Sequence, residues 1–584
     1  MIKHPKIVQR TPSDPVFSVA KSLGLSDFQA KLVANRTDQT EQLDEIIFPK
    51  LKHIQHPSAL KNIDLAAEII VKAIQSDGLI VLATDYDTDG VTSAWVATTA
   101  LCDYFGLPKS RIKHVIGDRK TGYGITEDVV KRILAIKEPV ALVISADQGS
   151  SDEARIATLK SHGIEVCVTD HHQIPQDGVP KSAICTVNPQ QEGCNYDKTV
   201  AGCFVIFLVM TQVRQALIQK NLIDKNSPSL KYLALNIALG TVADSVSLKS
   251  PNNRAIVHAG LQLINLFQSP AWQALKELND NQGLPFDAEF LGFQVATRIN
   301  AASRVSDVTT AFNFLTAPNV ELASHFLQQL DTDNQNRRAQ QEVMLQQAQQ
   351  QAKNKYRDDT YSMTLKLSGN AGIQGIIASR IGELYGVPTV AMTDLEDGTL
   401  AGSARGVVPD IDLRKAFQWM ADQKEGLFLS MGGHKGAAGC MIEIDSYPEF
   451  SELFEQAVKI QLGDNAPVPI IETDGELEDW QLTPTLIEEI NALEPFGREW
   501  PKPMFFGEFT IVQVREVGQT KTHLSCKLKT KTGAMFQAIY FNAKQSSEEP
   551  TPFIVGDKVQ CSYQPSLNNF AGRTSLQLRI QSMQ

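Results

Sequence analysis

Three aspartates stand at alternate positions just after one apolar run. Leu79 to Ala83 is apolar and short enough to form one buried parallel strand, and Asp85, Asp87 and Asp89 follow it. Carboxylates this close repel one another and raise one another's pKa unless a cation neutralises them. A hard divalent metal ion bound through oxygen is the natural cation. The alternative is an acidic turn in which one aspartate caps a helix that begins near Val91.

Three further apolar runs are followed by side chains that commonly bind metals. The runs are 140–145, 165–169 and 233–238, and we expect each to be a strand. The side chains that follow them are Asp147, Asp170, His171, His172 and Asp244. Function gathers at the carboxyl ends of strands in parallel sheets, so we expect the four clusters to converge. Helix caps and a core histidine are the alternatives, but four such clusters favour a two-metal site.

The elements that must position these groups alternate between strand and helix from residue 61 to 325. Besides the strands named above, 112–116 is an expected strand, and the expected helices are 65–75, 91–104, 127–136 and 151–162. This alternation predicts an α/β domain with a parallel sheet and right-handed crossovers. The segment 119–124, RKTGYG, follows a strand and is suited to cradling a phosphate, with a simple flexible loop as the alternative.

Three other parts surround this domain. Residues 1–60 predict an N-terminal arm with short helices that packs on the next domain. Residues 326–356 contain no Pro or Gly and predict a connecting helix, for which Gln-rich disorder is the alternative. Residues 357–465 predict a second α/β domain. Its glycine-rich segment 431–439 either binds phosphate through backbone amides or makes a tight turn.

Residues 466–584 predict a C-terminal β-barrel with an OB fold. The five strand candidates are 509–517, 523–530, 534–541, 558–564 and 575–582. From residue 501 onward there are ten Lys or Arg and five Asp or Glu, a local charge of +5. The aromatic residues interleaved with them are Phe536, Tyr540, Phe541, Tyr563 and Phe570. Cations with stackable rings suit the binding of single strands, and core packing is the alternative for the rings.

Composition limits the class of protein. At 584 residues the chain needs several domains, and its net charge of −11 argues against a uniformly basic surface but not against a local basic groove. The eight cysteines form no C-x-x-C pair and are typical of buried thiols in a reducing cytosol. No segment approaches the roughly 20 apolar residues of a membrane span. The first residues contain no apolar signal core, so we expect a cytoplasmic protein that does not bind membranes.

Together these motifs resemble those of the DHH phosphoesterase superfamily. The segments that resemble its four motifs are DYDTDG at 85–90, DQG at 147–149, DHH at 170–172 and GTVAD at 240–244. The segment GGHKGAAG at 432–439 resembles the signature of the DHH-associated domain. Within the superfamily, the pattern and length are most similar to the RecJ family of single-strand-specific 5′→3′ exonucleases. The further segments that carry this likeness are Asn188-Pro189, RINAASR at 298–304 and ALEPFG at 492–497.

The resemblance implies a role for each candidate residue. The implied ligands of two Mn²⁺ or Mg²⁺ ions are Asp85, Asp87, Asp89, Asp147, His171 and Asp244, with Asp147 bridging and Asp85 a near ligand. The implied catalytic groups are Asp87, Asp89, Asp147, His171, His172 and Asp244. The implied substrate-binding residues are Arg119, Tyr123, Arg298, Asn300, Arg304, Ser403, Arg405, Gly433 and His434. Thr88, Gln148 and Ser303 stand where the family usually has Ala, Asn and Gly, which removes no implied ligand.

The expected function is the degradation of single-stranded DNA from the 5′ end to mononucleotides, in recombination and repair. By resemblance, a single-strand-binding protein and a recombination helicase are expected partners, and the chain is expected to be a monomer. One alternative is a DHH phosphodiesterase acting on short oligonucleotides or cyclic dinucleotides, which would not need a C-terminal OB-like domain. Another is a nucleic-acid-binding scaffold without catalysis, which the intact set of candidate ligands disfavours.

Overall fold

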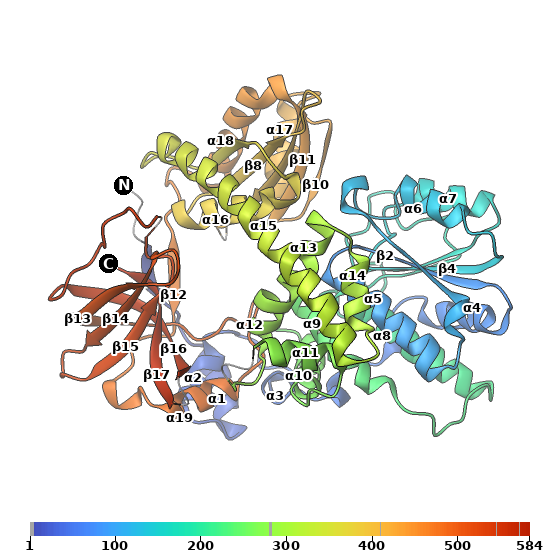
Figure 1. Ribbon diagram of the computed structural model, residues 1–584, viewed down its shortest axis with the longest axis horizontal. Helices are drawn as coiled ribbons and strands as arrows, with labels where there is room; N and C mark the ends of the chain where they lie inside the picture. Colours follow the sequence, from blue (N-terminus) through green and yellow to red (C-terminus); the bar gives the residue numbers. More distant parts are fainter. Residues whose placement is uncertain (1–4, 280–282, 409, 545, 571–572) are drawn as a thin grey trace.

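The computed structural model describes residues 5–279, 283–408, 410–544, 546–570 and 573–584 (Figure 1). A parallel sheet containing β2 and β4 lies at the right of Figure 1, a barrel of β13–β17 at the left, and a second sheet at the top. The long helix α15 (Val320–Lys355) runs between the two sheets. The predicted fold class is confirmed: a parallel α/β unit, a connecting helix, a second α/β unit and a C-terminal barrel.

The first sheet is entirely parallel, with the strand order β3-β2-β4-β5-β6. Its strands are β2 (Leu79–Thr84), β3 (Ile112–Ile116), β4 (Val140–Ala146), β5 (Val166–Thr169) and β6 (Cys185–Val187). Ile80 and Leu82 belong to one hydrophobic cluster, whereas Val81 and Ala83 belong to another. Both faces of β2 are therefore buried, which explains why its sequence is a continuous apolar run.

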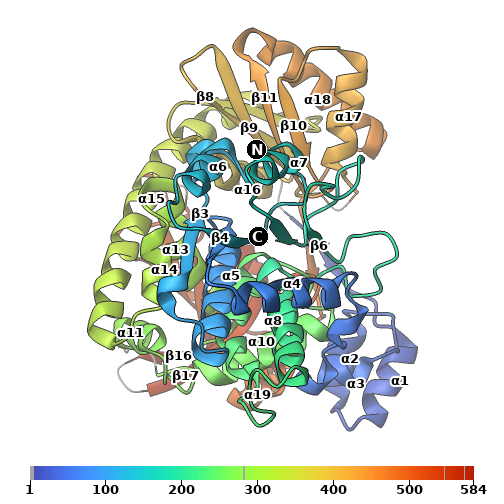
Figure 2. The same cartoon turned by 90° about the vertical axis from the view of Figure 1, so that its right-hand side faces the viewer.

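Helices cover both faces of this sheet. α4 (Ile63–Gln75), α5 (Thr88–Thr99) and α8 (Gly202–Gln219) share one cluster, and α6 (Glu127–Leu134) and α7 (Glu153–Ser161) share the other. Figure 2 shows α6 and α7 above the sheet and α4, α5 and α8 below it. The expected helices are confirmed, although α5 begins three residues before Val91 and continues as a π-helix to Tyr104.

One strand prediction is wrong. The apolar run 233–238 lies almost entirely in the helix α9 (Ala234–Ala243), which packs against α5 and α10 (Pro251–Ile264). A short run that is buried on every side carries no periodicity, so sequence alone does not separate a strand from a core helix. Asp244 consequently caps the C-terminus of a helix and does not follow a strand.

The connecting helix is confirmed and begins six residues before the predicted start. Asn319 caps α15 by accepting a hydrogen bond from the Leu322 amide at 2.9 Å. The helices between α10 and α15 are α11 (Pro270–Leu278), α12 (Ala288–Phe290), α13 (Thr297–Val305) and α14 (Thr309–Leu315), with a π-helix at Leu291–Ala296. α13 and α14 pack on α15, and so do α16 and β7 of the second unit. One continuous helix of 36 residues therefore joins the two units and excludes the disordered alternative.

The second unit is a mixed sheet with the strand order β10-β11-β9-β8-β7. Its strands are β7 (Met363–Leu367), β8 (Thr389–Asp394), β9 (Thr399–Arg405), β10 (Ser430–Gly433) and β11 (Ala437–Glu443). Its helices are α16 (Gln374–Tyr385), α17 (Leu413–Gln423) and α18 (Tyr447–Leu462). The glycine-rich segment makes the turn between β10 and β11, so the tight-turn interpretation holds structurally whatever else the segment binds.

The C-terminal strands close into a barrel, as predicted. They are β13 (Phe505–Val517), β14 (His523–Lys529), β15 (Met535–Tyr540), β16 (Lys558–Phe570) and β17 (Arg573–Met583), and α19 (Pro484–Asn491) precedes them. Tyr563 is 1% exposed and belongs to the core, so stacking on bases is the wrong interpretation for this ring. Phe541 is exposed, and the side chain of Phe570 lies outside the described residues.

The N-terminal arm contacts more than the next domain. β1 (Lys6–Gln9) pairs in parallel with β12 (Ile470–Thr473) of the C-terminal part. The arm's helices are α1 (Asp14–Ser22), α2 (Asp27–Ala34) and α3 (Leu43–Ile47). The buried Arg36 after α2 forms an ion pair with Asp474 at 2.9 Å. The N-terminal arm is thus joined to the start of the C-terminal part.

α8 is long and apolar enough by composition to cross a membrane, and 56% of its length is buried inside the protein. The expectation that no segment approaches the length of a membrane span overlooks this helix. Its residues from Gly202 to Met210 are all buried, and it packs on α4 and α5. These contacts are those of a core helix that covers the parallel sheet.

Candidate active site

The turn after β2 holds two carboxylates, those of the buried Asp85 and the half-buried Asp87. Asp87 caps α5, because its Oδ1 accepts hydrogen bonds from the amides of Asp89 at 2.9 Å and Gly90 at 3.1 Å. Asp85 lies one residue beyond the strand and is buried. The capping interpretation is therefore correct for Asp87. It does not compete with the metal interpretation, since a carboxylate has lone pairs for both partners.

Asp89 is anchored by the N-terminus of α8. Its two oxygens accept hydrogen bonds from the amides of Gly202 at 2.7 Å and Cys203 at 2.9 Å, where the positive end of the helix dipole favours a carboxylate. A Cβ atom on Gly202 would lie 2.5 Å from Asp147 Oδ1, and one on Gly240 would lie 3.0 Å from Asp89 Oδ1. Two glycines therefore leave the space in which the carboxylates approach the helices.

His171 lies at the centre of the cluster. Its Nε2 is 3.2 Å from Asp147 Oδ1, 3.7 Å from Asp244 Oδ2 and 3.8 Å from Asp89 Oδ2. Asp147 follows β4 in the left-handed region, with φ of 63°, and its amide donates to Thr169 O at 3.0 Å. The ends of β2, β4 and β5 and the C-terminus of α9 therefore converge on one point.

Asp170 orients both histidines. Its Oδ1 accepts hydrogen bonds from the His171 amide at 2.7 Å and from His172 Nδ1 at 2.8 Å, and its Oδ2 accepts one from the Ser150 amide at 3.0 Å. The Tyr123 hydroxyl donates to the Asp147 carbonyl at 3.0 Å and lies 2.8 Å from His172 Nδ1. Fixing Nδ1 in this way leaves the Nε2 lone pair of His172 for a ligand or a proton.

The cluster brings several carboxylates together without enough positive charge to balance them. Burial raises the pKa of Asp85, Asp147 and Asp244 well above the usual range, and repulsion by neighbouring carboxylates adds to the rise. Burial lowers the pKa of His171. Burial also opposes the charged form of His172, but the hydrogen bond with Asp170 and the negative charges of Asp170, Asp244 and Asp85 together outweigh it and raise the pKa to about 9.

The arrangement fits two divalent cations. Three groups have ligand atoms within 4.8 Å of one another: Asp85 with Asp87 and Asp147, Asp89 with His171 and Asp244, and Asp147 with His171 and His172. Among the described residues, Asp85 Oδ1, Asp147 Oδ1 and His171 Nε2 are buried without a hydrogen-bond partner. Such atoms need a partner, and oxygen donors with imidazole suit Mn²⁺, while oxygen donors alone suit Mg²⁺.

Four of the predicted substrate-binding residues surround this cluster. Asn300 Oδ1 accepts hydrogen bonds from the amide and the hydroxyl of Thr88, each at 2.9 Å. The Arg119 guanidinium lies 4.3 Å from the centre of the Tyr86 ring, and Arg304 donates to the Gly372 carbonyl of the second unit. Tyr123 contacts His172 as described above. Arg119 and Arg304 both carry positive charge toward the carboxylates of the first turn.

The other predicted substrate-binding residues are placed differently. Arg298 Nη2 forms an ion pair with Asp331 of α15 at 2.9 Å, so its guanidinium is engaged in the scaffold. Arg405 Nη1 donates to Ser403 Oγ at 2.9 Å on β9. Gly433 has φ of 141° at the end of β10, and His434 is exposed in the turn that follows. Burial lowers the pKa of His434, and the positive charges of Arg498, Arg405 and His172 lower it further. His172 is therefore close enough to act on His434, so the second unit faces the cluster.

Comparison with known proteins places the whole chain in one group. Residues 79–240 match the DHH family N-terminal domain, 360–460 match the DHHA1 domain, and 473–582 match the RecJ OB domain. Over 556 residues the chain is 31% identical to the single-stranded-DNA-specific exonuclease RecJ of Haemophilus influenzae, and the match covers 94% of each chain. The chain belongs to the RecJ family. The RecJ of Escherichia coli is also 31% identical, over 90% of each chain.

Solved RecJ structures share the fold. RecJ from Thermus thermophilus in complex with Mn²⁺ superposes with a TM-score of 0.76 at 23% identity, covering 100% of this chain and 79% of that chain. A second structure, of exonuclease RecJ bound to manganese, has a TM-score of 0.55 at 27% identity and covers 68% of this chain and 94% of that chain. The resemblance predicted from the motifs is therefore confirmed.

The three departures from the RecJ pattern have different surroundings. Thr88 is held by Asn300, as described above, and Ser303 Oγ lies 3.4 Å from Arg119 Nε. Gln148 is fully buried, and both of its side-chain amide atoms have no hydrogen-bond partner among the described residues. Two of the three substitutions thus touch predicted substrate-binding residues. Nothing in the structure explains Gln148.

Sequence reasoning missed the roles of four residues that shape this RecJ site. Asp170 belongs to the DHH motif, but no pattern marks it as the group that orients both histidines. Gly202 and Gly240 make room for Asp147 and Asp89, and Gly240 opens the GTVAD segment. Arg498 donates to the carbonyl of Ser245, next to Asp244, from the distant C-terminal part. The two glycines could have been noticed at the start of an apolar run and inside a motif, whereas nothing local marked Arg498.

We expect Asp170→Asn to weaken metal binding about 10- to 100-fold, because it removes the carboxylate that orients the ligand His171 and its neighbour His172. The pKa of His172 should fall from about 9, since its main stabilising partner is lost. Calorimetric titration with Mn²⁺ and the NMR titration of His172 measure both effects. Asp128→Asn, which breaks only an exposed ion pair with Arg132, should change neither.

We expect Mn²⁺ to stabilise the protein more at pH 8 than at pH 6. The raised pKa values of Asp85, Asp147 and Asp244 mean that the folded, metal-free protein binds more protons than the unfolded chain, so its stability falls as pH rises through them. Metal binding reverses this loss, because ligands must be deprotonated. Melting temperatures with and without Mn²⁺ at the two pH values test the sign. An equal gain at both would contradict it.

Proposed function

We propose that this chain is a metal-dependent 5′→3′ exonuclease that degrades single-stranded DNA to 5′-mononucleotides, in DNA recombination and repair. The observation that carries the proposal is the set of three ligand groups at one edge of the parallel sheet, each of which contains Asp147, His171 or both. The RecJ relatives support the substrate, because those of Haemophilus influenzae and Escherichia coli are named single-stranded-DNA-specific exonucleases. The barrel matched by the RecJ OB domain supports single-strand binding.

The chain's own groups divide the work of hydrolysis. Two Mn²⁺ or Mg²⁺ ions held by Asp85, Asp87, Asp89, Asp147, His171 and Asp244 would supply a nucleophilic hydroxide and neutralise charge on the phosphate. His172, oriented by Asp170 and Tyr123, is placed to hold or move a proton beside the cluster. Arg119 and Arg304 are placed to bind phosphate oxygens of the strand. Asn300 fixes the turn that carries Asp87 and Asp89 through its bonds to Thr88.

The second unit would hold the strand from the other side. Ser403, Arg405, Gly433 and His434 lie on β9 and at the turn after β10, and we propose that they contact the backbone of the substrate. Closely spaced glycines let backbone amides approach a phosphate, and the adjacent Lys435 adds charge. Arg298, engaged by Asp331, would act by fixing α13 to α15.

The division of the chain follows the same proposal. We propose an N-terminal arm (1–60), a DHH catalytic domain (61–325), a connecting helix (326–356), a DHH-associated domain (357–465) and an OB-fold domain (466–584). The eight free cysteines support a reducing cytoplasm. A monomeric state, a single-strand-binding protein and a recombination helicase as partners stay predictions from the family resemblance.

A time course with end-labelled strands tests this function. The protein with Mn²⁺ should release mononucleotides from a 5′-phosphorylated single strand, and release from a duplex should be much slower. Strands labelled at the 3′ end should shorten stepwise from the 5′ side. Cleavage of a cyclic dinucleotide but not of a long strand would overturn the proposal in favour of a small-substrate phosphodiesterase. Tight binding without hydrolysis would indicate a scaffold.

A further inference from the structure

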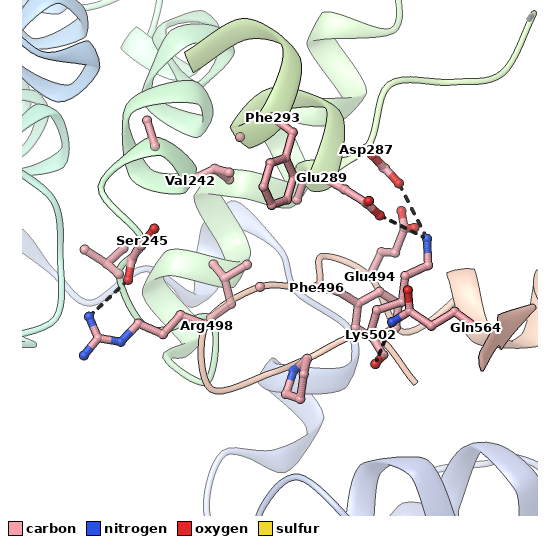
Figure 3. Close-up of a pocket in the computed structure, with 17 residues that line it drawn as sticks. Val242, Ser245, Asp287, Glu289, Phe293, Glu494, Phe496, Arg498, Lys502 and Gln564 are labelled. Carbon is pink, nitrogen blue, oxygen red and sulfur yellow. Dashed lines mark hydrogen bonds and ion pairs between the residues drawn. The ribbon is translucent and has the colours of Figure 1, made fainter. Parts of the chain in front are cut away.

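A pocket lies between the catalytic unit and the C-terminal part, beside the candidate metal ligands. It has a volume of about 470 Å³ (Figure 3). The catalytic side contributes Val242, Ser245 and Phe293, and the C-terminal segment contributes Phe496 and Arg498. Ser245 directly follows Asp244 in the chain, so the pocket lies next to a candidate metal ligand. None of these residues has a role in the function proposed above.

The position of Arg498 is fixed by the backbone around it. Its Nη1 donates to the Ser245 carbonyl at 3.3 Å, and its own carbonyl accepts from the Leu248 amide at 2.9 Å. The next residue, Glu499, accepts a hydrogen bond from Ser247 Oγ at 2.6 Å. The turn is thus attached to the loop after α9 at three points. The side chain itself is exposed, so the guanidinium has donors left for a ligand.

The charge of Arg498 acts on both sides of the site. The guanidinium donates to the carbonyl of Ser245, the residue after Asp244, and after burial its charge is the largest contributor to the lowered pKa of His434. An exposed arginine between a metal ligand and the turn after β10 is a phosphate-binding group by its chemistry.

Phe293 gives the pocket a second kind of contact. It lies in the π-helix Leu291–Ala296, its ring points toward the C-terminal segment, and it is 67% exposed. A large aromatic ring at this exposure beside a charged site is suited to stacking on a nucleobase, because every base has a π-face. Phe496 and Val242 provide apolar surface next to it.

The far end of the pocket carries carboxylates that are paired with Lys502 and Arg579. Asp287, Glu289 and Glu494 lie there, and Lys502 is 3.8 Å from Asp287 and 3.9 Å from Glu289. Burial raises the pKa of Glu494 to about 7. Because the cations at this end are already paired, the exposed Arg498 is the better placed group for a phosphate, and the paired polar groups are left for base edges.

We propose that this pocket is a subsite for one nucleotide of the single-stranded substrate, in which Phe293 stacks on the base and Arg498 binds a phosphate beside Asp244. The inference rests on the proposed function, since it names where that substrate lies. Arg498 is a substrate-binding residue, and Phe293 sets the preference for unpaired bases, because a base within a duplex cannot present its face to the ring.

Binding without cleavage tests the subsite. Anisotropy of a labelled oligothymidylate is measured in EDTA for the wild type, Phe293→Ala and Arg498→Gln at several salt concentrations. Phe293→Ala should raise Kd about 5- to 100-fold. Arg498→Gln should raise Kd and lower the slope of log K against log salt by about 0.7, the value for one phosphate contact to a single strand. Phe293→Trp should retain affinity, and Arg498→Lys should restore the slope.

Matched controls and an abasic scan separate this inference from general damage. Phe48→Ala and Arg357→Gln replace exposed residues of the same types away from the pocket and should bind as the wild type does. A single abasic site is moved along the strand. At one position near the 5′ end, the missing base should weaken binding by the wild type but not by Phe293→Ala. Variants that bind and respond to salt like the wild type, while the wild type still releases nucleotides with Mn²⁺, would overturn the subsite alone. No release by the wild type would overturn the proposed function instead.

Discussion

Replacing His171 by Ala should reduce Mn²⁺-dependent release of nucleotides by at least about 1,000-fold, which corresponds to about 4 kcal/mol in the barrier. His171 Nε2 faces three carboxylates, of Asp147, Asp244 and Asp89, at 3.2 to 3.8 Å. Burial lowers its pKa, so the imidazole is neutral and has a lone pair for a metal. Removing it takes one ligand from two of the three ligand groups at once.

The same variant should keep its fold. His171 Nε2 has no hydrogen-bond partner among the described residues, so its loss strands no donor or acceptor, and the metal-free melting temperature should stay within a few degrees of that of the wild type. The number of Mn²⁺ ions bound per chain, measured by titration, should be two for the wild type and fewer for His171→Ala. The control is His162→Ala, which removes an exposed histidine on the surface of the same unit. Undiminished release by His171→Ala would refute the metal site.

The predictable parts of this site are those in which metal-binding side chains directly follow an apolar run. Asp85, Asp87, Asp147 and His171 each follow an apolar run that is a strand in the structure, and parallel strands bring their carboxyl ends to one edge. Spacing along the chain therefore converts into proximity in space. The OB barrel was predictable for a related reason, because strands of period two with turns between them have few other solutions.

The parts that were not predictable depend on long-range contacts. The run before Asp244 is buried on all sides, and without periodicity its sequence does not distinguish a helix from a strand. Asp244 reaches the cluster all the same, because α9 packs against α5, which begins at the aspartate turn. Arg498 joins the site only because the C-terminal segment folds back on the loop after α9, a contact between residues about 250 positions apart. No local pattern encodes such a contact.

The residue that secures this long-range contact is Arg254, and its loss should have the second largest effect. Arg254 is fully buried in α10 and donates hydrogen bonds to four carbonyls, of Ile46, Leu248, Pro495 and Leu493, at 2.6 to 3.2 Å. Its guanidinium carbon lies 4.6 Å from the centre of the Trp500 ring. One side chain thus joins the N-terminal arm, the loop after α9 and the segment that carries Arg498.

Arg254→Met should destabilise the protein by about 4 kcal/mol, because four buried carbonyls lose their donors while the volume is nearly kept. Arg254→Lys should also be destabilised, since an ammonium cannot reach the same fork of acceptors. Urea unfolding followed by tryptophan fluorescence should show the C-terminal part unfolding before the parallel sheet. Limited proteolysis should cut the segment near Trp500 first.

A second arginine provides the matched comparison. Arg111 also donates only to carbonyls, those of Ala73, Ile74 and Gly78, but all of them belong to the parallel α/β unit. Arg111→Met should therefore lower the free energy of unfolding. It should not loosen the C-terminal segment, and it should leave the affinity for single strands unchanged. Arg254→Met should lower both the free energy of unfolding and the affinity for single strands, because the turn that positions Arg498 loses its hydrogen bonds to Arg254. If the two variants weakened single-strand binding equally, the hydrogen bonds of Arg254 would act only as a general core contact. The link from Arg254 through Trp500 to the pocket would then be wrong.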